Sequence, residues 1–394
     1  MDWCKNNNLC GGCTYGGMSY DEQLAEKEKQ LLGILTPVFD EDTVWEGTAP
    51  SPLQTAYKNK MEYSFGDECK GGPLTLGMHK KKSFYSVLDC SDCRIVHEDY
   101  NRIVAATSKF FGERGITYVN KRSHLGYLRH LVLRRSFSNG GILADLVTAD
   151  MAEGVFEDGE DALLNLWKDC LLSLELDGHI EGILHTRNNA LSDAVIDEGT
   201  SLLYGRDYIE ETLLGLSFKV TPFSFFQTNS KGAEVLYGLV RKYAGDVAGR
   251  TVYDLYSGTG TIAQLVAPVA DKVYGVEIVE EAVEAAKENA KSNGLTNCEF
   301  ICGDVLAVID GLEKKPDTII LDPPRDGLHP KMLPKIAAYG VDRIVYVACK
   351  PASFARDMEY FAQAGYRVER ASGCDMFPFT KHVETVCLLS RSTV

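Results

Sequence analysis

The stretch Asp254-Leu255-Tyr256-Ser257-Gly258-Thr259-Gly260-Thr261 decides the fold of this 394-residue chain. It includes the end of the strand-like run TVYDLY and leads into the helix-like run TIAQLVAPVA. Glycines at such a junction let the backbone come close to a ligand. We therefore expect a ligand at the carboxyl end of this strand, in a sheet whose strands alternate with helices.

The residues that follow repeat this alternation. After the glycine turn come KVYGVEI, the helical run EEAVEAAKENAKSNG, and three further strand-like runs, EFICGD, DTIILDPP and DRIVYVAC. Apolar strands separated by helices predict a parallel sheet covered on both faces. The sequence therefore predicts an α/β domain of the Rossmann type over residues 216–394.

The preceding residues show a different pattern. Residues 1–20 are rich in Cys, Gly and Asn and predict a tight loop, and 21–54 predict a helical segment that packs on the α/β domain. Residues 55–215 predict a β-rich central domain of strands and turns, with a helix over about 160–172. Within it, Asn139-Gly140-Gly141 supplies a hairpin turn between LRHLVLRRS and ILADLVT.

Composition restricts the class of protein. No apolar run reaches about 18 residues, and the N-terminus lacks the pattern of a secretory signal, so we expect a cytoplasmic protein without a membrane span. The net charge of −15 argues against general affinity for nucleic acid. Basic residues nevertheless cluster locally, which predicts a face that binds phosphates. They are Lys80, Lys81, Lys82, Lys121, Arg122, Arg129, Arg134 and Arg135.

Two ligands fit the glycine turn. Gly258, Gly260 and Ala263 match the dinucleotide pattern G-x-G-x-x-A, and Glu277 lies 277 − 258 = 19 residues further on, where a carboxylate can accept bonds from ribose hydroxyls. An NAD-dependent dehydrogenase is therefore one hypothesis. Asp254 favours S-adenosylmethionine instead, because a carboxylate there would repel a pyrophosphate but attract a cationic methionine moiety.

Two further strand ends carry acids that suit S-adenosylmethionine. Asp304 follows the strand EFICG, where its side chain can reach an adenine amino group. Asp322 ends the next strand in Asp-Pro-Pro-Arg, and the two prolines fix the backbone so that the carboxylate faces the ligand.

Two residues have the chemistry of a covalent catalyst and its base. Cys349 lies between a strand and a helix that starts at Pro351, and the helix N-terminus with the neighbouring Lys350 should favour its thiolate. Glu384 lies in the apolar strand HVETVCLLS, where desolvation would raise the pKa of its carboxyl and improve it as a base.

A second cysteine pattern predicts a metal site. Cys4, Cys10 and Cys13 lie within ten positions, and Cys90 or Cys93 can supply a fourth thiolate. Four thiolates suit structural zinc or an iron–sulfur cluster, and the spacing alone slightly favours zinc.

These residues resemble the RNA uracil-5-methyltransferase family, and specifically its iron–sulfur branch. The resemblance covers nearly the whole chain, and VACKPASFARD and TKHVE are its most specific motifs. It implies a C-terminal class I methyltransferase domain, S-adenosylmethionine as methyl donor and a [4Fe–4S] cluster rather than zinc. Many relatives carry an N-terminal RNA-binding barrel, and we expect this barrel to be absent here, because the sequence starts at the cysteine loop.

The resemblance also implies roles for individual residues. Cys349 is the expected nucleophile and Glu384 the expected base. Cofactor contacts are expected from Gln227, Asp254, Tyr256, Gly258, Gly260, Glu277, Asp304 and Asp322, and cluster ligands from Cys4, Cys10, Cys13 and, in preference to Cys90, Cys93. RNA contacts are expected from Lys58, Lys60 and Arg129, with Phe225 near the target base. Ser257 and Lys350 depart from the family pattern, which commonly has Cys and Asn or Asp there.

The expected reaction is methylation of carbon 5 of an unpaired uridine after Cys349 adds to carbon 6. Ribosomal RNA, specifically 23S, is the first expectation for the substrate and transfer RNA the second. No obligate protein partner is evident. A non-catalytic iron–sulfur RNA-binding factor is the alternative of another class, and the presence of both Cys349 and Glu384 argues against it.

Overall fold

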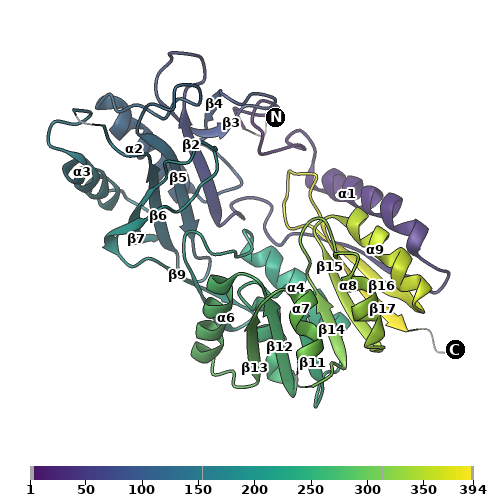
Figure 1. Ribbon diagram of the computed structural model, residues 1–394. Coiled ribbons are helices and arrows are strands. Elements are labelled where there is room, and N and C mark those ends of the chain that lie inside the picture. The colour runs from purple at the N-terminus through teal and green to yellow at the C-terminus, as the bar shows by residue number, and fades with distance from the viewer. Residues whose placement is uncertain (1–3, 153, 313, 392–394) are drawn as a thin grey trace. The chain divides into compact units, whose positions relative to one another are not determined.

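The computed structural model describes residues 4–152, 154–312 and 314–391. Its contacts divide the chain into two compact units (Figure 1). Unit 1 comprises Met1–Met18, Gln54–Thr212 and Lys219–Ser224, and unit 2 comprises Ser19–Leu53, Leu213–Phe218 and Phe225–Val394. Each unit has its own sheet and its own core.

Unit 2 is built on an eight-stranded sheet. Its strand order is β1 (Val44–Ala49), β16 (Tyr366–Cys374), β17 (Glu384–Arg391), β15 (Arg343–Ala348), β14 (Thr318–Leu321), β11 (Thr251–Leu255), β12 (Lys272–Glu277) and β13 (Cys298–Cys302). Only β17 runs antiparallel to its neighbours among the paired strands described. The predicted α/β sheet is therefore confirmed, with one reversed strand inside it.

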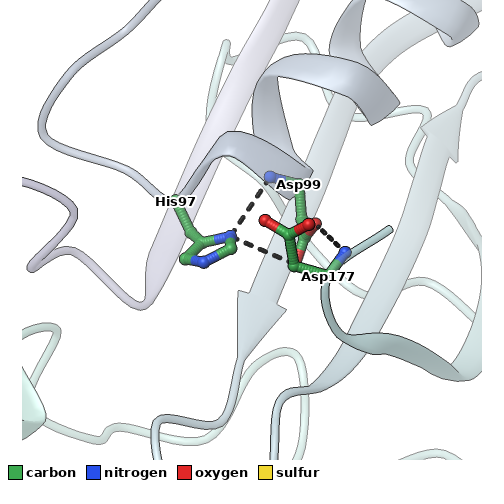
Figure 2. Close-up of side chains that lie close together, drawn as sticks. All are labelled: His97, Asp99 and Asp177. Atoms are coloured by element: carbon green, nitrogen blue, oxygen red, sulfur yellow. Dashed lines mark hydrogen bonds and ion pairs between the residues drawn. The ribbon is translucent and has the colours of Figure 1, made fainter. Parts of the chain in front are cut away.

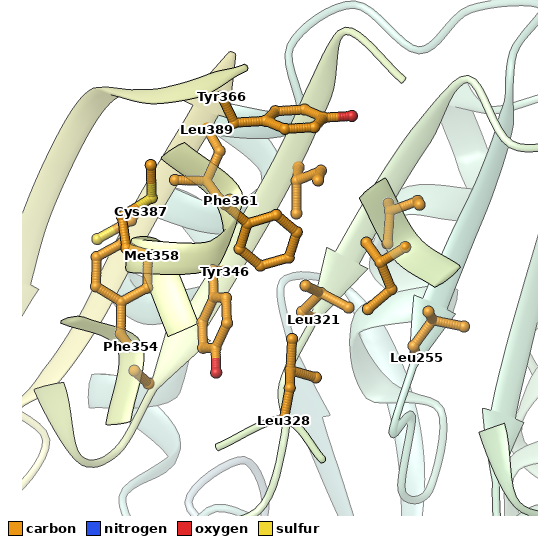
Figure 3. Packing of buried hydrophobic residues seen from close by; sticks show 14 of the residues in the cluster. Leu255, Leu321, Leu328, Tyr346, Phe354, Met358, Phe361, Tyr366, Cys387 and Leu389 are labelled. Atoms are coloured by element: carbon orange, nitrogen blue, oxygen red, sulfur yellow. The ribbon is translucent and has the colours of Figure 1, made fainter. Parts of the chain in front are cut away.

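Helices cover both faces of this sheet, as predicted. They are α1 (Tyr20–Leu35), α4 (Ser230–Ala244), α5 (Thr261–Val266), α6 (Glu280–Ser292), α7 (Val305–Val308), α8 (Met332–Ala338) and α9 (Pro351–Gln363). On one face, apolar residues of α1, α8 and α9 share a core with the strands, and Figure 3 shows Phe354, Met358 and Phe361 of α9 packed beside Tyr346 and Leu389. Helix α4 contacts β15, β16 and β17.

The topology fixes where a ligand can bind. Strand β11 lies between β12 and β14, so the chain leaves β11 toward one side and later returns on the other. Such a switch point opens a crevice at the carboxyl ends of the two central strands. The glycine turn follows β11 and Asp322 follows β14, so both lie at this crevice.

Unit 1 contains a seven-stranded sheet. Its strand order is β4 (Val87–Asp89), β3 (Thr75–His79), β2 (Lys60–Gly66), β5 (Leu128–Arg135), β6 (Gly141–Thr148), β7 (His179–Arg187) and β8 (Thr200–Gly205). The β5–β6 hairpin and α3 (Glu160–Leu172) confirm two predicted elements. Helix α2 (Glu98–Glu113) was not predicted, although its apolar residues Tyr100, Ile103, Val104 and Phe111 are all fully buried. A two-stranded sheet joins β9 (Ile209–Leu213) to β10 (Leu216–Val220).

The arginines of β5 do not form the basic face that the sequence predicted. Arg134 is 2% exposed, and its guanidinium donates to the carbonyl oxygens of Pro222 and Ser224. Arg135 donates to Asp99. These side chains satisfy backbone and carboxylate oxygens inside the unit because buried acceptors need partners, which leaves them no part in an exposed phosphate site.

Within the part of the chain described, no helix combines the length and apolar character that crossing a bilayer requires.

Candidate active site

The predicted site residues of unit 2 gather at one edge of its sheet. Parallel pairing of Leu255 with Leu321 sets the ends of β11 and β14 side by side. Glu277 ends the neighbouring strand β12, and Cys349 directly follows β15. Because β17 is antiparallel, its first residue, Glu384, lies at this same edge. The topology thus brings together residues that lie up to 130 positions apart, since 384 − 254 = 130.

The glycine turn has the backbone that a close ligand requires. Tyr256 has a φ of 68°, and Gly260, at 70°, precedes α5. A Cβ at Gly260 would lie 2.5 Å from the ring of Phe300, so no larger residue fits there. The carboxylate of Glu277 accepts hydrogen bonds from the backbone N–H of Gly258, at 3.0 Å, and of Ile278, at 2.8 Å. These bonds hold the turn against β12.

Asp254 presents an unsatisfied carboxylate at the base of the turn. It is fully buried, and its Oδ2 accepts a bond from the N–H of Ala263 at 2.8 Å, whereas Oδ1 has no partner. Burial, reinforced by the charge of Asp322, raises the pKa of Asp254 to about 8. A buried acceptor without a donor destabilises the fold unless a ligand supplies one. Asp254 is therefore suited to a cationic or hydrogen-bonding ligand.

Asp322 and Glu384 are two further acids with raised pKa values at this edge. Burial raises the pKa of Asp322 to about 7. Burial and the charge of Asp322 raise the pKa of Glu384, which is 8% exposed, to about 8. In the described ranges, no salt bridge reaches either carboxylate. Tyr237 of α4 lies among these acids and is hydrogen-bonded to Gln227, which places the predicted cofactor residue Gln227 beside the same edge.

Cys349 and Glu384 are neighbours across two strands. Ala348 pairs with Thr385 in the antiparallel register of β15 and β17, so the next pair along is Cys349 with Glu384. Cys349 is exposed, whereas Glu384 is buried. An accessible sulfur beside a desolvated carboxylate is the arrangement that covalent catalysis followed by proton removal requires.

The expectation of a thiolate favoured by its surroundings is wrong for the protein alone. Burial raises the pKa of the Cys349 thiol, and the charges of Glu384 and Asp322 raise it further. The charge of Arg325 acts in the opposite direction. The sequence could not show that the charges of Asp322 and Glu384, which come from other parts of the chain, would act on this sulfur.

The remaining predicted residues of unit 2 are distributed around this edge. The ring of Phe225, 69% exposed, lies over the glycine turn, since a Cβ at Gly258 would come within 3.9 Å of it. Asp304 is exposed and caps α7 by accepting a bond from the N–H of Leu306 at 2.9 Å. Its charge raises the pKa of Tyr256 in addition to burial, which dominates.

A buried polar network next to this edge was not predicted from the sequence. Lys27 of α1 is fully buried, and its Nζ donates to Asp375 Oδ1 at 2.6 Å and to the Phe377 carbonyl at 3.0 Å. Gln23 Oε1 accepts from the N–H of Phe379 at 2.7 Å, where φ is 65°. This network fixes the turn that leads into Glu384.

A signal for this support was present in the sequence. Gln23 and Lys27 share one helical face with Leu31 and Leu35, at spacings of four residues. All four are buried. Polar residues in register with a buried apolar stripe predict a buried polar contact.

The predicted cluster cysteines gather in unit 1. Burial raises the pKa of Cys93 to about 12, and Cys13, Cys10 and Cys4 add to this through their charges. Cys90 is buried, interacts with Cys10 and donates to the Leu88 carbonyl at 3.4 Å. Cys93 is therefore the cysteine that faces all three thiols of the N-terminal loop.

The residues predicted to bind RNA differ in their surroundings. Lys58 is largely desolvated next to Cys93, and Lys60 pairs with Glu62 at 2.7 Å. Arg129 is 8% exposed, and its guanidinium donates to the carbonyl oxygens of Asn188, Ala190 and Ser192. Arg129 therefore holds a loop from within rather than presenting its charge to a phosphate.

Besides the cysteines, the described ranges contain one group of three possible metal ligands whose ligand atoms lie within 4.8 Å of one another, namely His97, Asp99 and Asp177 (Figure 2). Its contacts account for it without an ion. Asp99 is fully buried and accepts bonds from the N–H of Asp177 at 2.8 Å and of Gly178 at 3.1 Å, and from Arg135 at 3.2 Å. These bonds tie the start of α2 to the segment before β7.

Comparison with known proteins gives a consistent result. Residues 187–392 match the model of the tRNA (uracil-5-)-methyltransferase family. An uncharacterized RNA methyltransferase of Clostridium tetani is 46% identical over 388 residues, which cover 98% of this chain and 83% of that protein. An uncharacterized RNA methyltransferase of Caldanaerobacter subterraneus is 45% identical over 389 residues, which cover 99% of this chain and 84% of that protein.

A solved structure resembles nearly the whole chain. The Pyrococcus abyssi tRNA (uracil-54, C5)-methyltransferase in complex with S-adenosyl-L-homocysteine has a TM-score of 0.77 and 28% sequence identity. The match covers 97% of this chain and 86% of that one. It confirms the predicted class I methyltransferase fold, and together with the family match it overturns the NAD-dependent dehydrogenase hypothesis.

Proposed function

Because the chain belongs to the RNA uracil-5-methyltransferase family and is thus an S-adenosylmethionine-dependent RNA methyltransferase, we propose that it methylates carbon 5 of a specific uridine through Cys349 and Glu384. The observation that carries the proposal is the register of β15 and β17, which sets an exposed thiol beside a buried carboxylate. We also propose a cytoplasmic location, where such RNA is found.

The residues at the switch point fit S-adenosylmethionine. Asp254 offers an unpartnered buried oxygen, Glu277 lies beside the glycine turn, and Asp304 and Asp322 follow the adjacent strands. Gln227 and the backbone of Tyr256, Gly258 and Gly260 would complete the contacts. S-adenosylmethionine would supply an electrophilic methyl group there, and its positive charge would offset the carboxylates that raise the pKa of Cys349.

The protein's own part in the reaction begins at Cys349. Its thiolate adds to carbon 6 of uracil, forming an S–C6 bond and moving the ring electrons into an enolate that makes carbon 5 nucleophilic. Carbon 5 then becomes methylated. Glu384 takes the proton from carbon 5, the electron pair of that C–H bond restores the ring double bond, and the S–C6 bond breaks to release the Cys349 thiolate.

Phe225 would lie against the target base. Its ring is exposed above the glycine turn, and an aromatic face can stack on a base that has left its own helix. Unstacking a base costs a few kcal/mol, so a uridine in an unpaired loop is the favoured target.

We further propose that Cys4, Cys10, Cys13 and Cys93 hold a [4Fe–4S] cluster. Cys93 lies near Cys4, Cys10 and Cys13, because the charges of all three act on its thiol, so four thiolates are available together. Each iron atom of a cluster takes one thiolate. The resemblance to the iron–sulfur branch favours such a cluster over zinc. Iron and sulfide analysis of anaerobically purified protein tests this, and one equivalent of zinc without iron would contradict it.

Two RNAs are candidate substrates. The sequence resemblance favours 23S ribosomal RNA, whereas the similarity to an archaeal enzyme named for uracil-54 of tRNA favours transfer RNA. Mapping 5-methyluridine in both RNAs from cells with and without the gene distinguishes them, because the true substrate loses the modification at one position.

The covalent step is tested by Cys349→Ala. We expect methyl transfer to fall below detection, while binding of S-adenosylmethionine, measured by calorimetry, stays within about twofold of the unchanged protein. The matched control is Cys302→Ala, since Cys302 is also exposed and lies at the same sheet edge but carries no proposed role. Retained turnover in Cys349→Ala would refute covalent catalysis.

A further inference from the structure

Three loops of unit 1 gather large apolar side chains on its surface. Phe84 and Tyr85 are 60% and 52% exposed, and Leu125 and Leu191 are 74% and 78% exposed. Lys121 joins the loops, since its Nζ donates to the Phe84 carbonyl at 2.9 Å and to Asp193 Oδ2 at 2.6 Å. We name these four residues, with Lys82, Lys121 and Arg122, the aromatic patch.

The aromatic patch borders a hollow. A shallow pocket of about 60 Å³, open to solvent, is lined by residues of all three loops, among them Phe84, Lys121, His124 and Leu191. Arg129 supports its floor by binding three carbonyl oxygens of the 188–192 loop. The pocket is therefore held by buried hydrogen bonds, although its rim is exposed.

Cations accompany both aromatic rings. Lys121 Nζ lies 4.2 Å from the centroid of the Phe84 ring, and the Arg122 guanidinium lies 5.0 Å from that of Tyr85. Lys121 is neutralised by Asp193. By contrast, Arg122 and the exposed Lys82, two positions before Phe84, form no salt bridge with any residue in the described ranges. This surface thus retains positive charge that the arginines of β5 do not supply.

The chemistry of the aromatic patch fits single-stranded RNA. A protein with a net charge of −15 repels a polyanion as a whole, so it needs a local surface where cations are not compensated. Exposed aromatic rings with adjacent guanidinium and ammonium groups offer stacking for bases and contacts for phosphates together. The apolar side chains alone would also suit a protein partner, but the unpaired positive charges beside them favour a polyanion such as RNA.

We infer that the aromatic patch binds unpaired nucleotides of the RNA substrate, with bases against Phe84 and Tyr85 and phosphates at Arg122 and Lys82. This inference rests on the proposed function for its RNA substrate but not on the chemistry at Cys349. The bound nucleotides need not include the target uridine, so the patch supplies affinity and selects RNA with an unpaired segment.

The test measures RNA binding separately from methyl transfer. Tyr85→Ala and Arg122→Gln are made in the full chain that also carries Cys349→Ala, and binding of single-stranded and duplex RNA oligonucleotides is measured by fluorescence anisotropy. Tyr204→Ala is the matched control for the ring, because Tyr204 is 43% exposed on β8 of the same unit. Lys109→Gln, on the exposed face of α2, is the control for charge.

We expect Tyr85→Ala to weaken single-stranded RNA binding about 10-fold and duplex binding much less. Arg122→Gln should reduce the slope of log affinity against log salt by about 0.7. Neither control should change these values. Equal affinities for Tyr85→Ala and Tyr204→Ala would overturn the inference, as would equal losses for single-stranded and duplex RNA.

A second measurement separates this inference from the proposed function. With Cys349 intact, Tyr85→Ala should raise KM for RNA and leave kcat within about twofold. If methyl transfer proceeds with an unchanged KM, the patch inference fails while the proposed function stands. If RNA binding depends on Tyr85 but no methyl transfer occurs, the patch inference stands and the proposed function fails.

Discussion

Two groups of buried carboxylates in unit 2 have opposite surroundings. Asp357 is fully buried and accepts hydrogen bonds from the Leu328 N–H at 2.8 Å, the Tyr346 hydroxyl at 2.7 Å and the Arg356 guanidinium at 2.6 Å. Asp375 likewise accepts from Lys27 at 2.6 Å, Tyr20 at 3.0 Å and the Phe377 N–H at 3.0 Å. The donors around these two acids stabilise their charges.

Asp254, Asp322 and Glu384 lack such donors. Asp254 accepts one hydrogen bond. Burial raises the pKa of Asp322 to about 7, and burial together with the charge of Asp322 raises the pKa values of Asp254 and Glu384 to about 8. Several donors surround a buried acid of unit 2 where that acid holds structure together. Among the residues described in unit 2, these three acids with few or no donors lie at the carboxyl edge of the sheet, where ligands bind.

The largest expected effect on the rate of methyl transfer comes from replacing Glu384, an acid of the second group. Glu384→Gln should lower the rate of methyl transfer about 10³-fold, because it removes the base, while leaving the free energy of unfolding unchanged or higher. A protein–RNA adduct should accumulate, since release of Cys349 follows proton removal. Rate, adduct on denaturing gels and urea unfolding are the measurements.

Asp357→Asn is the matched comparison for that variant. It should lower the free energy of unfolding by about 2 kcal/mol, because several donors lose a charged acceptor, and it should leave the adduct undetectable. If Glu384→Gln destabilised the protein as much as Asp357→Asn and formed no adduct, Glu384 would belong to the structural group.

The next effect concerns the buried ion pair. Lys27→Met leaves Asp375 buried without its cation and should destabilise the protein by about 3 kcal/mol. Lys27→Met with Asp375→Leu should recover most of this loss, because no unpaired charge remains. We expect kcat to stay low in the double variant while KM changes little, since the turn before Glu384 loses its anchors.

Conservative exchange provides the control for this pair. Lys27→Arg keeps the charge, so it should retain a higher kcat than Lys27→Met when both are measured under conditions where each variant is fully folded. Wild-type kcat in the double variant would show that Lys27 and Asp375 stabilise the fold without positioning Glu384.

The sequence predicted much of this site because strand ends can be recognised from residue patterns. Asp254, Glu277 and Asp322 each end an apolar run, and the parallel sheet brings such ends together. Antiparallel β17 was not predicted, because HVETVCLLS has the same apolar pattern in either direction. Long-range polar contacts were also missed: Lys27 and Asp375 are 348 positions apart. The local pattern marks Lys27 as a residue of the buried helical face, but it does not identify Asp375 as its partner.

The two groups of acids should also differ in how they make the free energy of unfolding depend on pH. The pKa of Glu384 rises from an ordinary 4.5 to about 8 on folding, so the folded protein holds a proton that the unfolded chain releases. Its contribution is fully present below pH 4.5 and is lost as the pH rises through about 8. Asp254 and Asp322 act in the same direction.

Glu384→Gln should therefore flatten the decline in unfolding free energy between pH 5.5 and 8.5, whereas Asp357→Asn should not. Urea unfolding at several pH values measures this slope. An identical slope in the unchanged protein and Glu384→Gln would mean that Glu384 is ionised throughout the range. The same proton governs activity, so kcat of the unchanged protein should rise toward pH 8.

The smallest effect on kcat and stability is expected at Tyr20, which is one of the donors around Asp375. Its hydroxyl donates to Asp375 at 3.0 Å and accepts from the N–H of Ser51 at 2.7 Å. Tyr20→Phe removes both bonds but leaves Asp375 with Lys27 and the Phe377 N–H, so the loss should be about 1 kcal/mol of unfolding free energy. Because the remaining donors still fix the turn before Glu384, kcat should fall less than twofold. A larger fall in kcat than the loss of stability explains would mean that the Tyr20–Asp375 bond helps to position Glu384. Asp375 would then serve the reaction as well as the stability of the fold.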